Sequence, residues 1–528
     1  KKFEEKETID ENSHVIFYGA GLGYHIELFA RKYPDTSFSI YEPSIGVFHH
    51  FLDKLNFKKL PVDNLKSLQC EFEPEALGVF LAKLLNKTNK KLIIMDLPIY
   101  ENAFTEQYNN FFRKFNELIK GTPNIVTEKQ GDFKNKTAIL VAAGPSLNEE
   151  IENLRYISDN GLAYIFSVGS SVNTLIYNGI YPHATSAIDP SVKNQVVFEI
   201  IKERGIREIP IIFGSSAGCK TLENYPGNKY HMITSQDSIA SYYLRNDDGS
   251  DVNRVYDAPT VAAATLQLIY LLGFDRIILV GQNLAYLDKK KYSEGITYHR
   301  SEVTDKQLED AQWVEDVYGN QILTTNVFNI MRRQIESYIK QMTDVNVINT
   351  TKGGAKIEGT EFTELKEIIN SSLKESIVDE KELQNLEINK TNYNKEYIAA
   401  QSKKMNKSYQ SALKINKDYR VVLKKIQNAI DRRKYAQAQG LYAKLDNELK
   451  KIENNDFYKT FILPMNRVQY KILADSIENL NEEKNPREQG KRVVESFANF
   501  IDICTDDIEM VEPIYNEMNE SINEYTSI

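Results

Sequence analysis

The sequence predicts an α/β protein in three parts: a Rossmann-like N-terminal domain, a central domain with a mostly parallel sheet, and an all-helical C-terminal domain. Up to about residue 360, short apolar runs alternate with helical patterns, as in a parallel sheet with helices on both faces. Beyond that point the chain is rich in Lys, Glu, Asn and Gln, and its apolar residues follow helical spacing. The predicted domains are 1–130, 131–360 and 361–528, a number that fits 528 residues.

Composition narrows the classes of function. The net charge is −9, so general nucleic-acid binding is not expected. Cys70, Cys219 and Cys504 lie far apart, which indicates a reducing compartment rather than a disulfide framework or a zinc site. The longest strongly apolar helical run, Val261–Leu272, is too short to span a bilayer, and no signal peptide opens the chain. We therefore expect a cytoplasmic protein without a membrane span, and the oligomeric state stays open.

The N-terminal part has the pattern of a Rossmann-like unit. A strand, His14–Tyr18, leads into a glycine-rich turn, Gly19–Gly23, and a second strand, Ser37–Tyr41, ends in Glu42. Glycines after a strand and an acidic residue about twenty positions later are typical of domains that bind nucleotides or S-adenosylmethionine. The glycine spacing is GxGxG rather than GxGxxG, so a turn kept only for packing is the alternative. Lys91–Asp96 is a further buried strand.

The central part contains seven short apolar runs that are predicted to be strands. These runs are Ala138–Ala142, Ala163–Val168, Ala184–Ile188, Ile209–Phe213, Met232–Thr234, Arg276–Val280 and Val345–Ile348. Helical patterns lie between them, at Glu149–Ser158, Val172–Tyr177, Val192–Glu203, Val261–Leu272 and Asn326–Gln341. Ligands of such sheets bind at the carboxyl ends of the strands.

The first of these strands ends at Gly144, Pro145 and Ser146, and a helical pattern follows. Free N–H groups at a helix start, together with the positive end of its dipole, form a natural phosphate seat. Gly144 allows close backbone approach, and Ser146 can cap the helix or donate to an oxygen. An ordinary strand–helix turn is the alternative. The turn is not a Walker A loop, because no Gly-Lys-Ser or Gly-Lys-Thr follows it.

Small polar residues follow the other central strands as well. Taken singly, each is a plausible capped turn, but together at one sheet edge they suit a ligand rich in hydroxyls and phosphate. They lack the dense carboxylates of an all-protein metal cage, so no metal site is predicted. The residues are Ser167, Ser170, Ser171, Asn173, Asp189, Ser191, Ser215, Ser216, Thr260, Gln282, Asn283, Gly353 and Gly354.

The C-terminal part is predicted to form several long helices. For its charged faces, solvation is the simple explanation, and a surface that docks a protein is the alternative. The expected core positions are Leu386, Ile398, Leu413, Ile415, Leu423, Ile426, Ile430, Leu441, Leu445 and Leu449.

The motifs of the central part resemble those of the motility-associated factor (Maf) flagellin glycosyltransferases, which belong to a wider family of uncharacterised-domain proteins. The resemblance covers residues of about 130–360, and the flanking domains fit that family's layout. It rests on five segments in order: Ile139–Leu147, Ser167–Ser170, Ala187–Ser191, Gly281–Tyr286 and Gly353–Gly359.

The same stretch is similar, more distantly, to the bacterial sialyltransferases of glycosyltransferase family 42. That similarity implies a nucleotide-sugar site over Gly144–Leu147, with Asn173 or the Ser170–Ser171 pair near the nucleotide and Asp189 where the family has asparagine. The family holds the leaving phosphate with two tyrosines six residues apart, a spacing that Tyr286 and Tyr292 keep. Its catalytic histidine has no counterpart in the matching stretch, and His299 is the nearest candidate for the general base.

The resemblance implies transfer of a nonulosonic acid, of the pseudaminic or legionaminic type, from its CMP-activated donor to Ser or Thr hydroxyls of flagellin. The partners would be flagellin and the CMP-sugar, with no cofactor and no required metal. Three alternatives stay open. The first is a 6-hydroxymethylpterin diphosphokinase-like enzyme, which needs magnesium; the second is a non-enzymatic flagellin-binding assembly factor. The third, a methyltransferase, rests only on Gly19–Gly23 and Glu42.

Overall fold

The structure is a computed structural model of the whole chain, and it forms two compact units. One unit comprises residues 1–105 with 403–516, and the other comprises 106–402 with 517–528. The predicted division into three domains at 130 and 360 stays a prediction. The described residues are 13–20, 24–42, 62–70, 91–96, 110–256, 258, 260–298, 301–309, 311–379, 382–383, 390–466, 470, 473 and 485–527.

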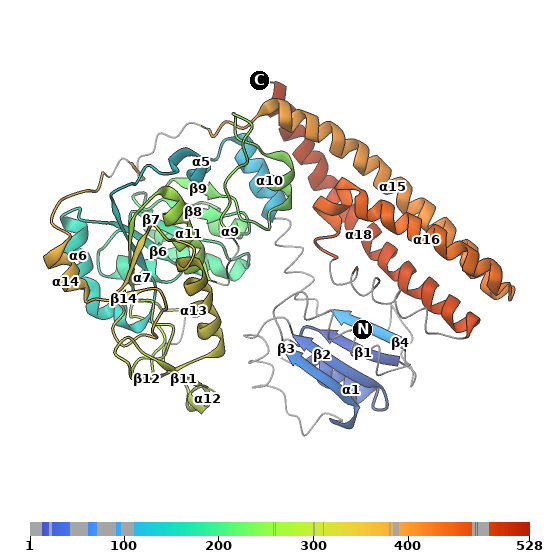
Figure 1. The fold of residues 1–528 in the computed structure, drawn as a ribbon, viewed down its shortest axis with the longest axis horizontal. Coiled ribbons are helices and arrows are strands. Elements are labelled where there is room, and N and C mark those ends of the chain that lie inside the picture. Colours follow the sequence, from blue (N-terminus) through green and yellow to red (C-terminus); the bar gives the residue numbers. More distant parts are fainter. Residues whose placement is uncertain are drawn as a thin grey trace. The chain divides into compact units, whose positions relative to one another are not determined.

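The N-terminal strands form a four-stranded parallel sheet in the order β3-β2-β1-β4 (Figure 1). This order is that of the first four strands of a doubly wound nucleotide-binding fold. The predicted Glu42 is fully buried, and its carboxylate accepts a hydrogen bond of 2.6 Å from the Ala20 N–H in the turn after β1. Gly21 and Gly23 lie outside the described residues. The elements are β1 (Ser13–Tyr18), α1 (Tyr24–Lys32), β2 (Ser37–Glu42), η2 (Val62–Asn64), β3 (Leu65–Cys70) and β4 (Lys91–Asp96).

The central sheet has eight parallel strands in the order β14-β13-β10-β5-β6-β7-β8-β9. From β5 the chain adds strands outward on one side as far as β9, and it then returns to place β10 on the other side of β5. The predicted mostly parallel α/β architecture is confirmed. The strands are β5 (Thr137–Val141), β6 (Tyr164–Val168), β7 (Ala184–Ala187), β8 (Ile211–Gly214), β9 (Lys229–Met232), β10 (Arg276–Val280), β13 (Asn346–Asn349) and β14 (Glu361–Phe362).

Helices cover both faces of this sheet (Figure 1). Alternate residues of β5 show the two faces: Leu140 packs in the core under α11 and α13, whereas Ile139 packs in the core under α6 and α14. Residues 110–120 are also helical. The helices are α5 (Ile125–Lys129), η3 (Pro145–Glu150), α6 (Ile151–Asp159), α7 (Ser171–Tyr177), η4 (Val192–Phe198), α8 (Glu199–Arg204), α9 (Cys219–Leu222), α10 (Ser238–Tyr243), α11 (Val261–Leu272), α12 (Asp305–Glu309), α13 (Asn326–Ile339) and α14 (Leu365–Ser371).

The structure corrects three local predictions. The strand predicted at Met232–Thr234 runs from Lys229 to Met232, because the apolar residues of this edge strand continue beyond its pairing with β8. The helix predicted from Glu149 is preceded by one 3₁₀ segment that begins at Pro145. An antiparallel hairpin, β11 (Gln312–Glu315) with β12 (Gln321–Thr324), was not predicted, because most of its residues are polar or solvent-facing.

His183 makes the stability of the central fold depend on pH. Its Nδ1 accepts a 2.8 Å hydrogen bond from the Ile165 N–H, and burial lowers the pKa of His183 from 6.5 to about 4. Because the folded state binds this proton more weakly than the unfolded chain, the stabilisation is present above pH 6.5 and is lost as the pH falls through 4.

We therefore expect wild type to lose about 2–3 kcal/mol relative to His183→Asn between pH 7.5 and 4.5. Asn can keep an acceptor near the Ile165 N–H but does not titrate in this range. Urea denaturation of both proteins at the two pH values measures the difference in the free energy of unfolding. The contributions of titratable groups that both proteins share cancel in this comparison. Parallel loss in the two proteins would contradict the prediction.

The C-terminal helices pack around an aromatic core. Tyr409 lies 4.9 Å from Phe457 and 5.2 Å from Tyr515, measured between ring centroids, and its hydroxyl donates to Glu512. The predicted core position Leu413 is wrong: it is 41% exposed, because it lies about 100° around the helix from buried Ala412. The elements are α15 (Lys395–Asp431), α16 (Tyr435–Asn454), η6 (Tyr458–Ile462) and α18 (Pro486–Ser527).

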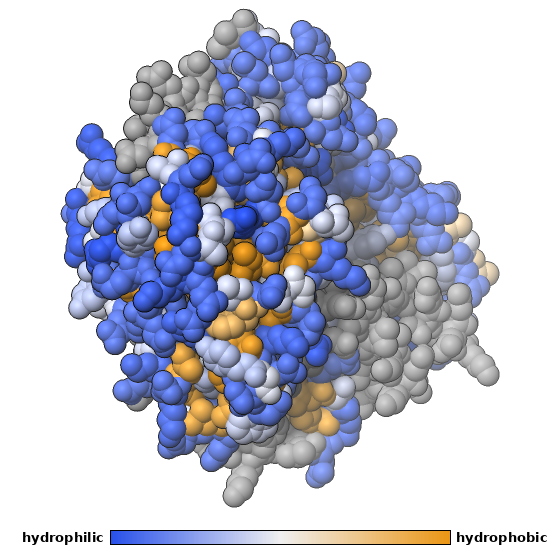
Figure 2. All heavy atoms as spheres, turned by 60° about the vertical axis from the view of Figure 1, so that its left-hand side comes forward, coloured by the Kyte–Doolittle hydropathy of each residue, from blue (hydrophilic) through white to orange (hydrophobic). Residues whose placement is uncertain are grey.

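Within the described residues, no helix combines the length and the apolar character needed to cross a membrane. The face in Figure 2 is mainly hydrophilic, and its hydrophobic atoms form patches that hydrophilic residues separate.

Candidate functional site

The change of direction after β9 places the topological switch point of the central sheet between β5 and β10, where ligands of open α/β sheets bind. At this point the loop after β5 is hydrogen-bonded to the loop after β10. The Gly144 N–H donates to the Gly281 carbonyl at 2.8 Å, and the Ala142 N–H donates to the Val280 carbonyl at 2.9 Å. A Cβ on Gly144 would lie 2.2 Å from Asn283 Oδ1 and 2.4 Å from the Gly281 oxygen. Glycine at 144 is therefore required for the two loops to meet.

Asn283 occupies the helix start that was predicted to seat a phosphate. Its Oδ1 accepts from both the N–H and the hydroxyl of Ser146, at 3.2 and 2.8 Å. Ser146 and Asn283 are both buried, and Pro145 fills the first position of the 3₁₀ segment. Both the N–H and the hydroxyl of Ser146 thus have a partner within the protein. Binding of a sugar donor by Gly144, Pro145 and Ser146 stays a prediction.

This pair leads to a graded stability prediction. Asn283→Ala should cost about 1–3 kcal/mol, because it leaves a buried N–H without its acceptor, whereas Ser146→Ala should cost about 1 kcal/mol, because the backbone bond survives. Chemical denaturation measures both values. An equal loss for the two variants would contradict the prediction, because it would show that the bond from the Ser146 N–H to Asn283 contributes no stability.

A third segment, after β13, closes around the same loop. The Gln282 N–H donates to Thr351 Oγ1 at 3.1 Å, and the Ala355 N–H donates to the Asn283 carbonyl at 2.8 Å. A Cβ on Gly354 would approach Thr351 Cγ2 to 2.7 Å, and Gly353 has a φ of +57°. The predicted residues Gln282, Asn283, Gly353 and Gly354 therefore lie together, as a glycine-dependent support of the switch point.

The carboxyl end of β6 gathers hydroxyl and amide groups. The Asn173 side-chain N–H donates to the Val197 carbonyl at 2.8 Å and to the Tyr298 hydroxyl at 3.1 Å. Ser170 also bonds to the Tyr298 hydroxyl. No atom of the described residues beyond its chain neighbours lies within 4 Å of where a Cβ of Gly169 would be. Ser170, Asn173 and Tyr298 thus form a connected polar cluster beside open space.

Tyr292 lies within range of an electrostatic interaction with Tyr298 of this cluster. Burial raises the pKa of both tyrosines above the ordinary value of 10, so both hydroxyls stay protonated at neutral pH. The segment that contains them is anchored at the switch point, because the Ser293 N–H donates to the Ala143 carbonyl at 2.9 Å and Thr174 Oγ1 lies 2.8 Å from Ser293 Oγ. Two hydroxyl donors are therefore held at one sheet edge.

Tyr286, the other tyrosine predicted to hold the leaving phosphate, lies in different surroundings. It is 6% exposed, its ring centroid lies 6.2 Å from that of Phe328, and its N–H donates to the Leu323 carbonyl at 2.8 Å. These contacts are those of a packing residue under the hairpin. His299, the predicted general base, lies outside the described residues.

The remaining predicted residues cap loops and helices at the same edge. Asp189 Oδ1 accepts from the Ser191 N–H at 2.8 Å, and Ser191 Oγ accepts from the Lys193 N–H at 3.2 Å. Burial raises the pKa of the Asp189 carboxyl, and the Ser191 N–H lowers it in part. Thr260 caps α11 by accepting from the Ala262 N–H at 3.3 Å.

Several buried polar atoms near these strand ends have no hydrogen-bond partner among the described residues, among them Ser167 Oγ, Ser186 Oγ, Gln282 Oε1 and Asn349 Nδ2. A buried polar atom without a partner costs about 1–3 kcal/mol, and a ligand that bonds to it recovers part of that cost. Ser167 and Gln282 were singled out from the sequence, whereas Ser186 was not.

Tyr298 is the main residue that the sequence reasoning missed. The signal was present, because Tyr292 and Tyr298 repeat the six-residue spacing of Tyr286 and Tyr292. Choosing between the two pairs requires knowing which tyrosine faces Ser170 and Asn173.

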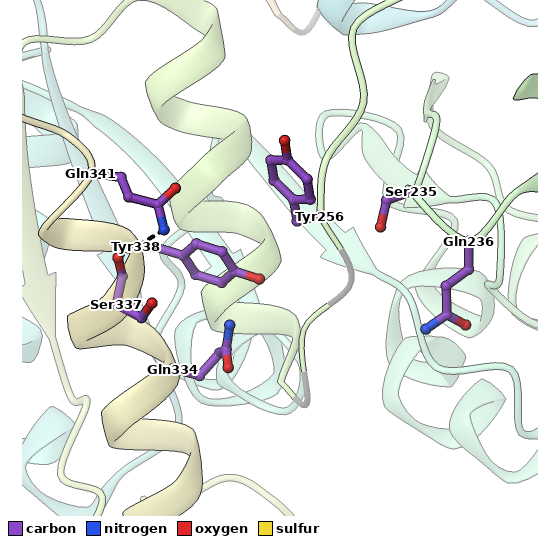
Figure 3. Close-up of a pocket in the computed structure, with 7 residues that line it drawn as sticks. All are labelled: Ser235, Gln236, Tyr256, Gln334, Ser337, Tyr338 and Gln341. Atoms are coloured by element: carbon purple, nitrogen blue, oxygen red, sulfur yellow. Dashed lines mark hydrogen bonds between the residues drawn. The ribbon is translucent and has the colours of Figure 1, made fainter. Parts of the chain in front are cut away.

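A separate cavity of about 300 Å³ has an uncharged lining (Figure 3). In this view Gln334, Ser337 and Tyr338 project from α13, Gln341 follows the C-terminal end of that helix, and Tyr256 lies beside α11. Ser235 and Gln236 complete the lining. None of the predicted donor-binding or catalytic residues lines it, so the cavity is distinct from the predicted site. No three His, Cys, Asp or Glu side chains of the described part of the chain are grouped to hold a metal ion.

Comparison with known proteins adds to this geometry. Residues 109–289 match the family model of the 6-hydroxymethylpterin diphosphokinase MptE-like proteins. The matched region contains β5 to β10 as well as Ser170 and Asn173 of the polar cluster, and it ends before Tyr292. No curated protein sequence matches the chain.

Among solved structures, the chain is similar to the Maf glycosyltransferase from Magnetospirillum magneticum AMB-1, with 14% identity and a TM-score of 0.47. The alignment covers 97% of this chain and 82% of that one. The family model thus matches part of the central region to the diphosphokinase-like proteins, which were one alternative from the sequence, and the similar structure is that of a Maf glycosyltransferase, the family that the sequence motifs resemble.

Proposed function

We propose that this chain is a glycosyltransferase that moves a nonulosonic acid, of the pseudaminic or legionaminic type, from a CMP-activated donor to Ser or Thr hydroxyls of flagellin. The observation that carries the proposal is the polar cluster of Ser170, Asn173 and Tyr298 at the carboxyl end of β6, with Tyr292 in electrostatic range of Tyr298. The motifs shared with the Maf and sialyltransferase families support the identity of donor and acceptor.

The chemistry needs little beyond positioning and charge stabilisation. The bond between the sugar's anomeric carbon and the phosphate oxygen breaks, and the acceptor oxygen bonds to that carbon. Negative charge develops on the departing CMP phosphate, where the hydroxyls of Tyr292 and Tyr298 can donate to it. The acceptor proton passes to a base, for which His299 remains the proposed residue.

Incubation of the purified chain with flagellin and CMP-pseudaminic or CMP-legionaminic acid tests the proposal. Intact-mass measurement should show flagellin heavier by whole sugar residues, with CMP released in equal amount. Tight donor and flagellin binding without turnover would instead favour a non-enzymatic assembly factor. Absence of both binding and transfer with either donor would reject the proposal.

The match of residues 109–289 to a diphosphokinase family model favours one second candidate, pyrophosphate transfer from ATP to a hydroxymethylpterin. That reaction transfers a diphosphate group from ATP and is metal-assisted. Incubation with ATP, magnesium and 6-hydroxymethylpterin, followed by measurement of AMP, distinguishes it from sugar transfer.

Metal dependence separates the two candidates. For sugar transfer we expect turnover to persist in excess EDTA, because tyrosine hydroxyls can stabilise the leaving phosphate without a cation. The measurement is CMP release with and without chelator, after dialysis of the protein. Complete loss on chelation, restored by magnesium, would contradict metal-independent transfer and support the second candidate.

A further inference from the structure

Charge on the C-terminal helices is strongly segregated. Between residues 403 and 431, α15 contains eight basic residues and two acidic residues, a net charge of +6 in a chain whose total is −9. Between residues 493 and 527, α18 contains nine acidic residues and no Lys, Arg or His. The two helices belong to one sequence but present opposite charge.

One face of α15 concentrates lysine. Positions that follow one another at intervals of three or four residues lie along one side of a helix. Eight such positions of α15 are all exposed. Five of the eight are lysines, and none is acidic. We call this row the lysine stripe; from Lys403 to Lys425 it is about 33 Å long. Its positions are Lys403, Lys407, Gln410, Lys414, Lys417, Val421, Lys425 and Asn428.

The bundle itself does not use this stripe. The opposite face of α15 supplies the core, through buried residues such as Tyr409, Ile415 and Tyr419. The ion pair from α15 to α18 joins Arg420 to Asp502 at 2.7 Å, and Arg420 lies about 100° around the helix from Val421 at the centre of the stripe. No stripe lysine forms an ion pair with the described residues of α18.

Among the described residues, no carboxylate lies within 4 Å of a stripe lysine, although the neighbouring Lys404 pairs with Asp456 at 2.7 Å. Lys403 with Lys407, and Lys414 with Lys417, are like charges one helical turn apart, a spacing that destabilises a helix by a few tenths of a kcal/mol. Helix stability thus does not explain the arrangement.

We propose that the lysine stripe docks a carboxylate-rich face of a partner protein. A second helix with acidic residues at three- and four-residue spacing would match the positions of the lysines along α15. The stripe contains Val421 as its one apolar residue, so it lacks the hydrophobic anchors of a stable interface and fits rapid, salt-sensitive association.

The same composition distinguishes this partner from a membrane or a nucleic acid. Insertion into a bilayer needs an exposed apolar face, but the apolar face of α15 lies in the core. Single-stranded nucleic acids are bound with stacking aromatic side chains, and the stripe has none. The acidic residues of α18 would also repel a partner of negative charge, so that it approaches α15 in a defined orientation.

The test measures binding of the full chain to a fluorescein-labelled polyglutamate peptide of about 30 residues, which is about 45 Å long as a helix. Lys407→Gln/Lys414→Gln/Lys417→Gln should weaken binding about tenfold at low salt. The matched control, Lys444→Gln/Lys450→Gln/Lys459→Gln, removes the same charge from other exposed positions and should change binding less than about twofold. Equal melting temperatures establish that both variants fold.

Equal weakening by the two triple variants would overturn the proposal, because it would reflect net charge alone. Tighter binding of the wild type to phosphatidylserine vesicles or to a DNA oligonucleotide than to polyglutamate would overturn it as well. So would a loss of dimer mass on analytical ultracentrifugation of the stripe variant, since the stripe would then contact a second copy of the chain.

Discussion

Tyr298→Phe is expected to lower the rate of sugar transfer by about 10²–10³-fold, equivalent to roughly 3–4 kcal/mol of transition-state stabilisation. The substitution removes the hydroxyl that Asn173 and Ser170 hold in place at the end of β6. A preorganised donor in a partly dry site stabilises developing phosphate charge far more than a hydroxyl in water does. The fold should survive, because the ring and its packing remain.

The measurement is kcat for CMP release, with the melting temperature as the check on folding. Tyr292→Phe should also lower the rate, since Tyr292 belongs to the same segment and lies within electrostatic range of Tyr298. Tyr286→Phe is the matched control, because Tyr286 packs under the hairpin against Phe328. Near-normal turnover by Tyr298→Phe together with a large loss for Tyr286→Phe would return the phosphate contact to the pair expected from the family spacing.

Gly281→Ala is expected to destabilise the protein by about 2–4 kcal/mol. The φ of Gly281 is +68°, and a Cβ there would lie 2.4 Å from the Ala142 carbonyl oxygen and 3.1 Å from Leu147 Cβ. Backbone strain in the left-handed region costs about 1 kcal/mol, and overpacking against backbone adds about 1–3 kcal/mol. The substitution also forces apart the β5 and β10 loops that meet at the switch point.

Gly205→Ala isolates the strain from the clash. Gly205 caps α8 at a φ of +63°, and no atom in the described part of the chain beyond its neighbours lies within 4 Å of its Cβ position. That variant should lose only about 1 kcal/mol. Urea denaturation of both variants measures the difference. A loss for Gly281→Ala no larger than that for Gly205→Ala would mean that the two loops relax around the new methyl group.

Much of the fold can be predicted from the sequence, because buried parallel strands are continuous apolar runs. Arg276–Val280 is predicted and observed with the same ends, and the run predicted at Ala138–Ala142 is observed one residue earlier. The hairpin β11–β12 escapes prediction because Trp313 and its neighbours are exposed and keep no simple apolar alternation. Edge elements of this kind are defined by their pairing rather than by burial.

The candidate site divides in the same way. The Gly144-Pro145-Ser146 turn and the polar strand ends can be read from local residue types, since glycine, proline and serine have local conformational preferences. That Ser146 donates to Asn283 cannot be read, because the two residues are 137 positions apart and meet only when β5 pairs with β10.

By itself, then, the sequence determined the α/β class, the parallel central sheet, the helical C-terminal part and the set of polar residues at one sheet edge. Periodicity and turn chemistry are local properties, so they survive without knowledge of the fold. The tertiary structure alone decided that Tyr298 joins Ser170 and Asn173 while Tyr286 is buried under the hairpin. Both tyrosines have the same spacing to Tyr292, and only the path of the chain across the strand ends separates a hydroxyl at the site from a ring in the core.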